Sequence, residues 1–178
     1  MKLSDFDFEL PPELIARLPA ERRDASRLLR LDRASGALSH HRFADLPDLL
    51  DEGDFLVLND SRVLPARLLG RIAGSAAEML VVRDLGAGML EALCRPASRF
   101  VPGAEFVADG GPRAVVLEAG GRGRRLLRFD REYARVLEHG YAPLPPYIKR
   151  RAAEAAERRE FDRERYQTVY AREPGSIA

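Results

Sequence analysis

The sequence is poor in the residues that build disulfide frameworks and metal sites. Of its 178 residues, one is cysteine, three are histidine and none is tryptophan. The single Cys94 excludes an internal disulfide and a metal site made only of cysteines. His40 and His41 are adjacent, so on a strand their side chains point to opposite faces, and only His139 remains. We therefore expect a protein that works without a metal.

Long apolar runs are also absent. No stretch approaches the roughly 20 apolar residues that span a bilayer. The first seven residues lack a basic segment followed by an apolar one, so we expect no secretory signal. Hydrophobic residues make up 46% and charged residues 32% of the chain, a balance typical of soluble folded domains. We expect a cytoplasmic protein with no membrane association.

Arginine supplies nearly all of the positive charge, and the charge is unevenly spread. Residues 1–60 carry 8 basic and 13 acidic side chains, residues 61–150 carry 15 and 9, and residues 151–178 carry 6 of each. A basic middle section fits a module that faces phosphate, and Arg124 and Arg125 are its candidate RNA-binding residues. An arginine-rich proteome would produce the same excess, and charge alone leaves both interpretations open.

The first 62 residues show a mixed α/β pattern. We expect a helix opened by proline, a hairpin and a second short helix, at residues 11–16, 27–42 and 44–52. The apolar run Asp54–Leu58 has the length and composition of a fully buried strand.

After Pro65, short β-like runs recur with glycine-bearing turns between them. These runs lie at residues 67–71, 78–83, 90–95, 105–108, 114–118 and 126–129. Their spacing indicates a small antiparallel barrel or sandwich. Helical periodicity returns at residues 133–138 and, after the stiff connector Pro143–Pro146, at residues 151–171, where Asp162 is a plausible N-cap.

These patterns predict a mixed α/β (α+β) fold. An antiparallel β-barrel-like module, residues 63–145, is expected to be inserted into a discontinuous α/β frame made of residues 1–62 and 146–178.

Asp84–Gly88 invites comparison with the glycine loop of nucleotide-binding methyltransferases. That loop joins a strand to a helix, because the helix N-terminus and the closely approaching backbone bind the ligand. Here the next run, residues 89–95, has a strand pattern, so a hairpin turn is favoured. A small methyltransferase that uses S-adenosylmethionine remains an alternative function.

A polar motif, Asn59–Arg62, directly follows the apolar run. Functional side chains favour the ends of buried strands, where a rigid scaffold meets an open crevice. Arg62 and Arg67 flank Pro65, and both present planar groups that suit phosphate or carboxylate. Forming a turn is, however, the commonest use of Asn, Asp and Ser.

Two later motifs combine aromatic and basic side chains. Pro145–Arg150 contains Tyr147 and Lys149, which suits stacking on a base beside a phosphate, although composition alone slightly favours an interdomain linker. Tyr166 and Tyr170 are four residues apart, so on a helix their rings share a face, and ordinary packing of that face is the simpler interpretation.

The order of the motifs is more specific than any one of them. The runs that matter are, in order, Ser4–Asp7, Pro11–Ala16, Arg23–Leu29, Leu58–Leu68, Pro143–Ile148 and Arg165–Ala171. Their succession resembles the S-adenosylmethionine:tRNA ribosyltransferase-isomerase family of queuosine biosynthesis. The resemblance runs from residue 4 to residue 178 and is weakest in the β module, where relatives commonly have a tryptophan.

This resemblance implies an activity. The ribosyl moiety of S-adenosylmethionine would be transferred and isomerised onto the 7-aminomethyl-7-deazaguanine at the wobble position of a tRNA, giving epoxyqueuosine-tRNA, adenine and methionine. It implies S-adenosylmethionine as co-substrate, no metal, tRNA as partner and a monomer. Because the family continues beyond the block that ends this chain, the chain is expected to be an N-terminal half that is inactive by itself.

The resemblance also suggests roles for the motif residues. Asp60 is the candidate catalytic or orienting carboxylate. The candidate substrate-binding residues are Asn59, Ser61, Arg62, Arg67, Tyr147, Lys149, Arg165, Tyr166 and Gln167. The competing class of function is a non-catalytic RNA-binding β-barrel module on a helical frame.

Overall fold

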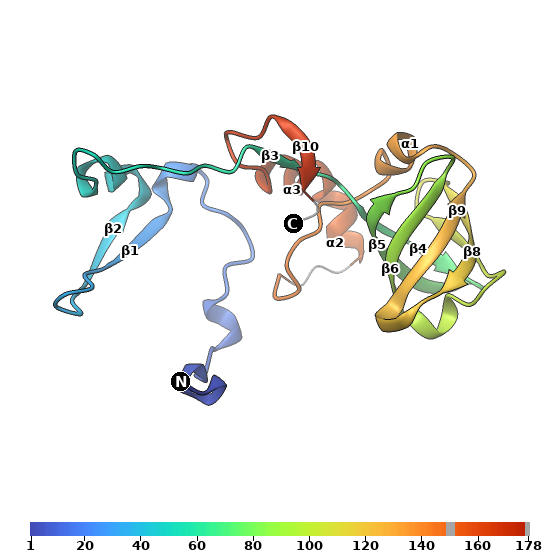
Figure 1. Ribbon diagram of the computed structural model, residues 1–178, viewed down its shortest axis with the longest axis horizontal. Helices are drawn as coiled ribbons and strands as arrows, with labels where there is room; N and C mark the ends of the chain where they lie inside the picture. Colours follow the sequence, from blue (N-terminus) through green and yellow to red (C-terminus); the bar gives the residue numbers. More distant parts are fainter. Residues whose placement is uncertain (149–151, 177–178) are drawn as a thin grey trace. The chain divides into compact units, whose positions relative to one another are not determined.

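The chain forms two compact units. The computed structural model describes residues 1–148 and 152–176 (Figure 1). One unit comprises Met1–Leu58 and Pro146–Lys149, and the other comprises Asn59–Pro145 and Arg150–Ala178. This division differs from the predicted domains, because the segment that follows residue 150 belongs with the barrel and not with the N-terminal residues.

The N-terminal unit is built from short elements around one hairpin. Its elements are η1 (Leu3–Phe6), η2 (Pro12–Leu14), η3 (Arg23–Ala25), β1 (Arg27–Leu31), β2 (Leu38–Arg42) and η4 (Phe43–Leu49). The strands β1 and β2 pair antiparallel, as predicted. The Asp32 carboxylate holds the hairpin turn, accepting hydrogen bonds from the Ala34 and Ser35 amides and from the Ser35 hydroxyl. Both predicted helices of this unit form as 3₁₀ turns.

The apolar run Asp54–Leu58 is not the buried strand that its composition indicates. No strand is assigned to it, and Phe55 and Val57 are 94% and 97% exposed. A strand needs a neighbour to satisfy its backbone groups. The described residues provide none for this run, and the first paired segment that follows is β3 (Ser61–Val63).

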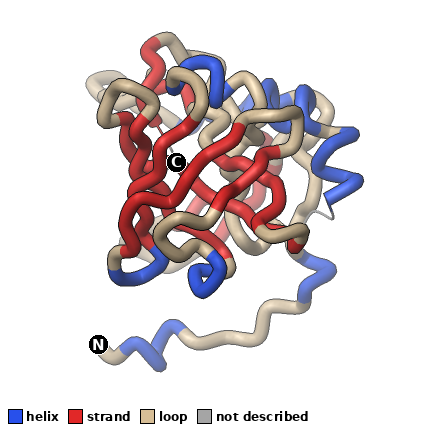
Figure 2. The backbone as a smooth tube through the Cα atoms, turned by 90° about the vertical axis from the view of Figure 1, so that its right-hand side faces the viewer, coloured by secondary structure: helices blue, strands red, loops and turns tan. Residues whose placement is uncertain are grey.

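The second unit contains a closed six-stranded barrel, all of whose pairings are antiparallel. The strands are β4 (Arg67–Ile72), β5 (Ser75–Asp84), β6 (Met89–Arg95), β7 (Glu105–Ala108), β8 (Arg113–Ala119) and β9 (Arg124–Phe129). Their order around the barrel is β4-β5-β6-β9-β8-β7, and β7 closes onto β4. Figure 2 shows them as obliquely crossing tubes. The predicted fold class, a mixed α/β fold with an antiparallel barrel, is confirmed.

The barrel interior is the core of the molecule. Alternate residues of each strand point inward, so a sequence such as that of β4 reads as alternately half-exposed and buried. Phe100 and Phe106 are fully buried, with ring centroids 5.7 Å apart. Among the described residues, every buried apolar side chain lies between residues 66 and 155. The N-terminal unit therefore has no buried apolar core among the residues described.

The closure of the barrel depends on a glycine. Gly70 of β4 pairs with Ala108 of β7. A Cβ at position 70 would lie closer than 3.0 Å to the Val107 carbonyl oxygen and to the Phe106 ring. Only a residue without a side chain lets the two strands approach closely enough to pair.

Helices and one further strand pair complete the second unit. These elements are α1 (Tyr133–Leu137), α2 (Ala152–Glu157), α3 (Arg159–Arg165) and β10 (Glu173–Ser176). The predicted helical segment is divided into α2 and α3, and Arg158 is the N-cap residue of α3. Asp162 is not an N-cap but lies inside α3, where it is 9% exposed. Among the helices that the structure describes, none has the length and apolar character needed to cross a membrane.

Replacing Gly70 with alanine should open the barrel. Overpacking of this kind costs about 3 kcal/mol, which for a chain of this size lowers the melting temperature by roughly 6–12 °C. Gly121→Ala is the matched control, because a Cβ there meets nothing within 4 Å. Thermal unfolding followed by circular dichroism measures both variants. Equal melting temperatures would contradict the closure argument.

Candidate functional site

Two sequence motifs that are a hundred residues apart meet in the second unit. Strand β3 pairs in parallel with β10, with Ser61 opposite Glu173 and Arg62 opposite Pro174. The Asp60 carbonyl accepts hydrogen bonds from the Arg172 amide at 2.6 Å and from the Glu173 amide at 3.3 Å. Figure 1 shows the two strands side by side, close to α3. The motif Asn59–Arg62 therefore runs along a fixed neighbour.

Gln167 clasps the end of β3. Its side-chain carbonyl accepts a hydrogen bond from the Val63 amide, and its side-chain amide donates one to the Val63 carbonyl, both at 2.8 Å. A primary amide used in this way satisfies a backbone donor and a backbone acceptor together, as a neighbouring strand would. Gln167 follows α3 and is not on a helix as the periodicity predicts.

Further hydrogen bonds fix the start of the motif. The Thr168 hydroxyl donates to the Asn59 carbonyl at 3.0 Å, and the Asn59 side chain accepts from the Ser61 amide at 3.0 Å. The side chains of Asp60 and Arg62 are exposed. Within the described part of the chain, neither has an ion-pair partner. The result is a rigid backbone that presents a carboxylate and a guanidinium to solvent.

Arg67 is held differently. Its guanidinium forms an ion pair with Glu78 on the neighbouring strand β5, with 2.5 Å between Nη2 and Oε2. Its backbone exchanges two hydrogen bonds with Tyr141. Arg67 is therefore partly neutralised by protein, whereas Arg62 is not.

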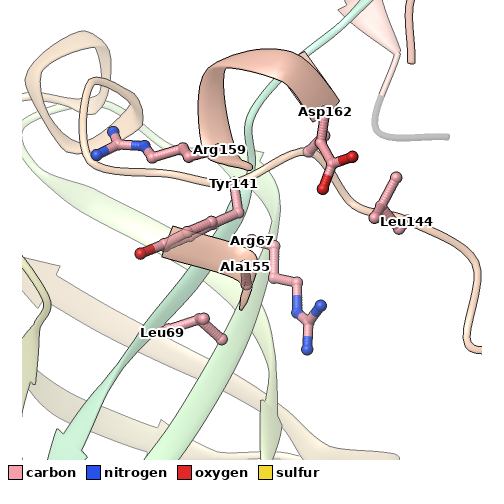
Figure 3. Close-up of a pocket in the computed structure, with 8 residues that line it drawn as sticks. Arg67, Leu69, Tyr141, Leu144, Ala155, Arg159 and Asp162 are labelled. Atoms are coloured by element: carbon pink, nitrogen blue, oxygen red, sulfur yellow. The ribbon is translucent and has the colours of Figure 1, made fainter. Parts of the chain in front are cut away.

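A small pocket lies beside Arg67, between the barrel and α3 (Figure 3). Its lining residues are Arg67, Leu69, Tyr141, Ala142, Leu144, Ala155, Arg159 and Asp162. The space admits at most about one water molecule, so it is too small for a nucleoside. The pocket is instead part of the packing contact between the barrel and the helical segment that contains α3.

Arginines of α3 anchor it to the end of α1. Arg159 donates to the Gly140 carbonyl at 3.1 Å and to the Glu138 carbonyl, and its guanidinium lies 5.3 Å from the centre of the Tyr141 ring. Arg163 donates to the Leu137 carbonyl at 2.8 Å. Cations suit the carbonyl-rich C-terminal end of a helix. The helix that precedes Gln167 is thereby fixed to the barrel unit.

The remaining predicted substrate-binding residues belong to other segments of the chain. Tyr147 is 60% exposed and belongs to the N-terminal unit, and Lys149 lies outside the described residues. The guanidinium of Arg165 lies 5.9 Å from the centre of the Phe161 ring on its own helix, and Tyr166 caps the end of α3.

The predicted RNA contact of Arg125 needs correction. Arg125 is 8% exposed, and its guanidinium donates to four backbone carbonyls, those of Ala97, Phe100, Gly120 and Arg124. A guanidinium used in this way has no free edge for phosphate. Arg124 remains exposed, although Nη1 lies 2.5 Å from Glu91. Arg124 also holds the pKa of the Glu91 carboxyl below its usual range by hydrogen bonding to it.

Two other features noted in the sequence have a structural role. Asp84–Gly88 forms the turn between antiparallel strands β5 and β6, with no helix after it, so the glycine loop of a methyltransferase is absent there. Cys94 is buried in the barrel, and burial raises its pKa to about 12. Its side chain is therefore a neutral thiol at physiological pH. Among the described residues, no cluster of histidine, cysteine and carboxylate side chains has the geometry of a metal site.

Sequence reasoning missed several residues that hold the site. Thr168, Arg159 and Arg163 act through backbone carbonyls far away in sequence, and such contacts leave no local pattern. Strand β10 contains Pro174 and Gly175, which are both depleted in strands. The motif Arg165–Ala171 identified Gln167 as a candidate residue. The motif alone does not reveal that the Gln167 side-chain amide binds the Val63 backbone.

Comparison with known proteins gives consistent matches. A family model described as "Queuosine biosynthesis protein" matches residues 3–178. The S-adenosylmethionine:tRNA ribosyltransferase-isomerase of Thermotoga maritima is 46% identical over 180 residues, which cover 100% of this chain and 51% of the relative. The protein of the same name from Acetivibrio thermocellus is 43% identical over 184 residues, covering 100% and 52%. The chain thus spans about half the length of the curated relatives it matches.

A solved structure is also similar. It is the crystal structure of S-adenosylmethionine tRNA ribosyltransferase from Thermotoga maritima, with a TM-score of 0.40 and 42% sequence identity. The similarity covers 82% of this chain and 52% of that one.

Removing the Gln167 side chain should loosen β3. Gln167→Ala deprives the Val63 amide of its acceptor, so we expect its hydrogen exchange to accelerate about tenfold, the equivalent of one lost hydrogen bond. Gln167→Glu keeps an acceptor for that amide and should retain most of the protection. Residue-resolved exchange by NMR measures both. Unchanged exchange at Val63 in the alanine variant would refute the clasp.

Proposed function

Because the chain belongs to the family of queuosine biosynthesis proteins, we propose that it supplies the N-terminal half of an S-adenosylmethionine:tRNA ribosyltransferase-isomerase. The observation that carries this proposal is the pairing of β3 with β10. Two motif blocks of the resemblance, Leu58–Leu68 and Arg165–Ala171, are joined there by Gln167 and Thr168. The relatives that bear this enzyme name align over the whole of this chain.

The proposed reaction uses S-adenosylmethionine as a ribosyl donor. The sulfonium acidifies the adjacent 5′ carbon, and a general base removes a proton from it. Opening of the ribose ring then expels adenine. The aminomethyl group of the 7-deazaguanine in tRNA attacks the ribosyl unit, and closure of the epoxide expels methionine. The products are epoxyqueuosine-tRNA, adenine and methionine.

Asp60 is the proposed catalytic or orienting carboxylate. It lies on a backbone fixed by β10, and its carboxylate is exposed without an ion-pair partner among the described residues. Such a group can accept a proton or face a developing positive charge without first breaking an ion pair. Arg62, equally exposed, is proposed to hold a carboxylate or phosphate of a substrate.

The other candidate residues have different proposed roles. Gln167 is proposed to position β3 and not to touch a substrate, since its amide is engaged with Val63. The further proposed substrate contacts are Asn59, Ser61, Arg67, Tyr147, Lys149, Arg165 and Tyr166. We also propose that the enzyme needs no metal and acts in the cytoplasm as a monomer, as the resemblance implies.

The activity is proposed to require the half of the relatives that this chain does not span. The apolar run Asp54–Leu58 directly precedes the motif and is exposed. Exposed contiguous apolar segments of this kind usually pack against another element. We propose that the second half of the relatives covers this run.

The reaction is tested by product analysis. The chain is extended with the second half of the Thermotoga maritima relative and incubated with S-adenosylmethionine and tRNA that carries the 7-deazaguanine precursor. We expect free adenine from the extended chain and from the intact relative, and none from the 178-residue chain alone. S-adenosylhomocysteine would indicate a methyltransferase instead. Retained RNA binding without either product would indicate a binding module.

Asp60→Asn in the extended chain should lower turnover at least about a hundredfold with little change in tRNA affinity. Asparagine keeps the shape of the side chain and removes its charge, so the loss should fall on the chemical step. Asp48→Asn, at an exposed carboxylate of the N-terminal unit, is the control. Normal turnover of Asp60→Asn together with a lower melting temperature would mean that Asp60 only stabilises its turn.

A further inference from the structure

The two ends of the barrel differ in charge. One end is formed by the β4–β5 turn, the connection from β6 to β7 and the β8–β9 turn, and we call it the basic end. In Figure 1 it lies opposite α1, at the yellow-green segment around residue 100. Its arginines are Arg71, Arg95, Arg99, Arg122 and Arg124, and the glutamates among or beside them are Glu105, Glu118, Glu78, which lies opposite Arg95, and Glu91, which pairs with Arg124. The end beside α1 instead mixes arginines with Asp84, Asp109, Asp130, Glu132 and Glu138.

Most arginines of the basic end are not neutralised by protein. In the part of the chain that the structure describes, Arg71, Arg95, Arg99 and Arg122 form no ion pair. Arg71 donates to the Gly74 carbonyl and Arg99 to the Ala76 carbonyl, each at 3.0 Å. These bonds orient the side chains and leave the positive charge uncompensated. At the other end, Arg131 and Arg135 pair with Asp130 and Glu138.

The buried Arg125 makes the basic end rigid. Its guanidinium donates to the Ala97 and Phe100 carbonyls at 2.6 and 2.5 Å, and to the Gly120 carbonyl at 2.9 Å. One side chain thereby ties η5 (Ala97–Arg99) to the β8–β9 turn. At the tip of that turn, between glycines, Arg122 adopts a left-handed conformation with φ 54°. The exposed guanidinium groups are therefore carried by turns that are fixed before any partner arrives.

We propose that the basic end binds the phosphate backbone of the RNA substrate, away from the reacting base. The proposal rests on the proposed function, which provides an RNA partner. Arginine forks on three separate turns match a chain of regularly repeated phosphates. Such contacts add affinity and register without reading sequence. Because Asp60 precedes β3 and is not part of the basic end, these arginines act on tRNA affinity and not on the chemical step.

The test is a binding measurement on the 178-residue chain with an unmodified tRNA transcript as probe. In Arg95→Glu/Arg122→Glu, we expect the affinity at low salt to fall about tenfold or more, and the slope of log affinity against log salt to fall by about one for each lost phosphate contact. Arg113→Glu/Arg135→Glu changes the net charge equally at the other end and should bind almost as tightly as the parent chain. Melting temperatures verify that all variants fold, and Arg95→Gln/Arg122→Gln provides a milder pair.

Several outcomes would overturn the proposal. Equal weakening by both reversal pairs would mean that only net charge matters. No weakening by the first pair, or no binding by the parent chain, would place RNA elsewhere. Displacement of tRNA by polyglutamate at equal charge concentration would favour an acidic protein partner. The assay contains no S-adenosylmethionine, so a failure here leaves the adenine-release result intact, and an absence of adenine release leaves this binding result intact.

Discussion

The clasp of Gln167 on Val63 is the interaction on which the candidate site depends. Strand β3 has only three residues, and its regular neighbour β10 has a register irregularity between Pro174 and Ser176. A parallel pair this short has few backbone hydrogen bonds and is not stable by itself. The Gln167 side chain completes the pairing of Val63 by accepting a hydrogen bond from its amide and donating one to its carbonyl. The orientation of Asp60 and Arg62 therefore follows from a residue outside their own motif.

The barrel was accessible from the sequence because its signal is local. Alternation of apolar and polar residues with glycine turns between them specifies both the faces and the ends of the strands, as in Glu105–Ala108, where prediction and structure agree to the residue. The run Asp54–Leu58 has an equally strong pattern but no neighbour among the described residues. Composition indicates that a segment can form a strand, but the segment forms one only if a neighbouring strand pairs with its backbone.

The site was only partly accessible, for a related reason. Asn59–Arg62 and Arg165–Ala171 stand out as motifs, but from spacing alone turn formation was the better explanation of the first and ordinary packing of the second. Their proximity arises from hydrogen bonds between residues 104 positions apart, which no periodicity encodes. For Arg125, by contrast, the sequence predicted a contact that the structure contradicts. A basic pair suggests phosphate, yet the strand alternation of β9 turns Arg124 outward and Arg125 inward, where backbone carbonyls occupy it.

Arginines of α3 connect the segment that precedes β10 to the barrel within the second unit. Arg159 and Arg163 bind the carbonyls at the end of α1, which the chain reaches directly from the last strand of the barrel. Gly140 lies so close to Pro65 that even a Cβ would clash, so the segment that precedes β4 packs against the same junction. The β3–β10 pair and the basic end thus belong to the same compact unit. If the proposed phosphate contacts form at the basic end, binding of the RNA there would also help to position its reacting base, because both surfaces belong to one unit.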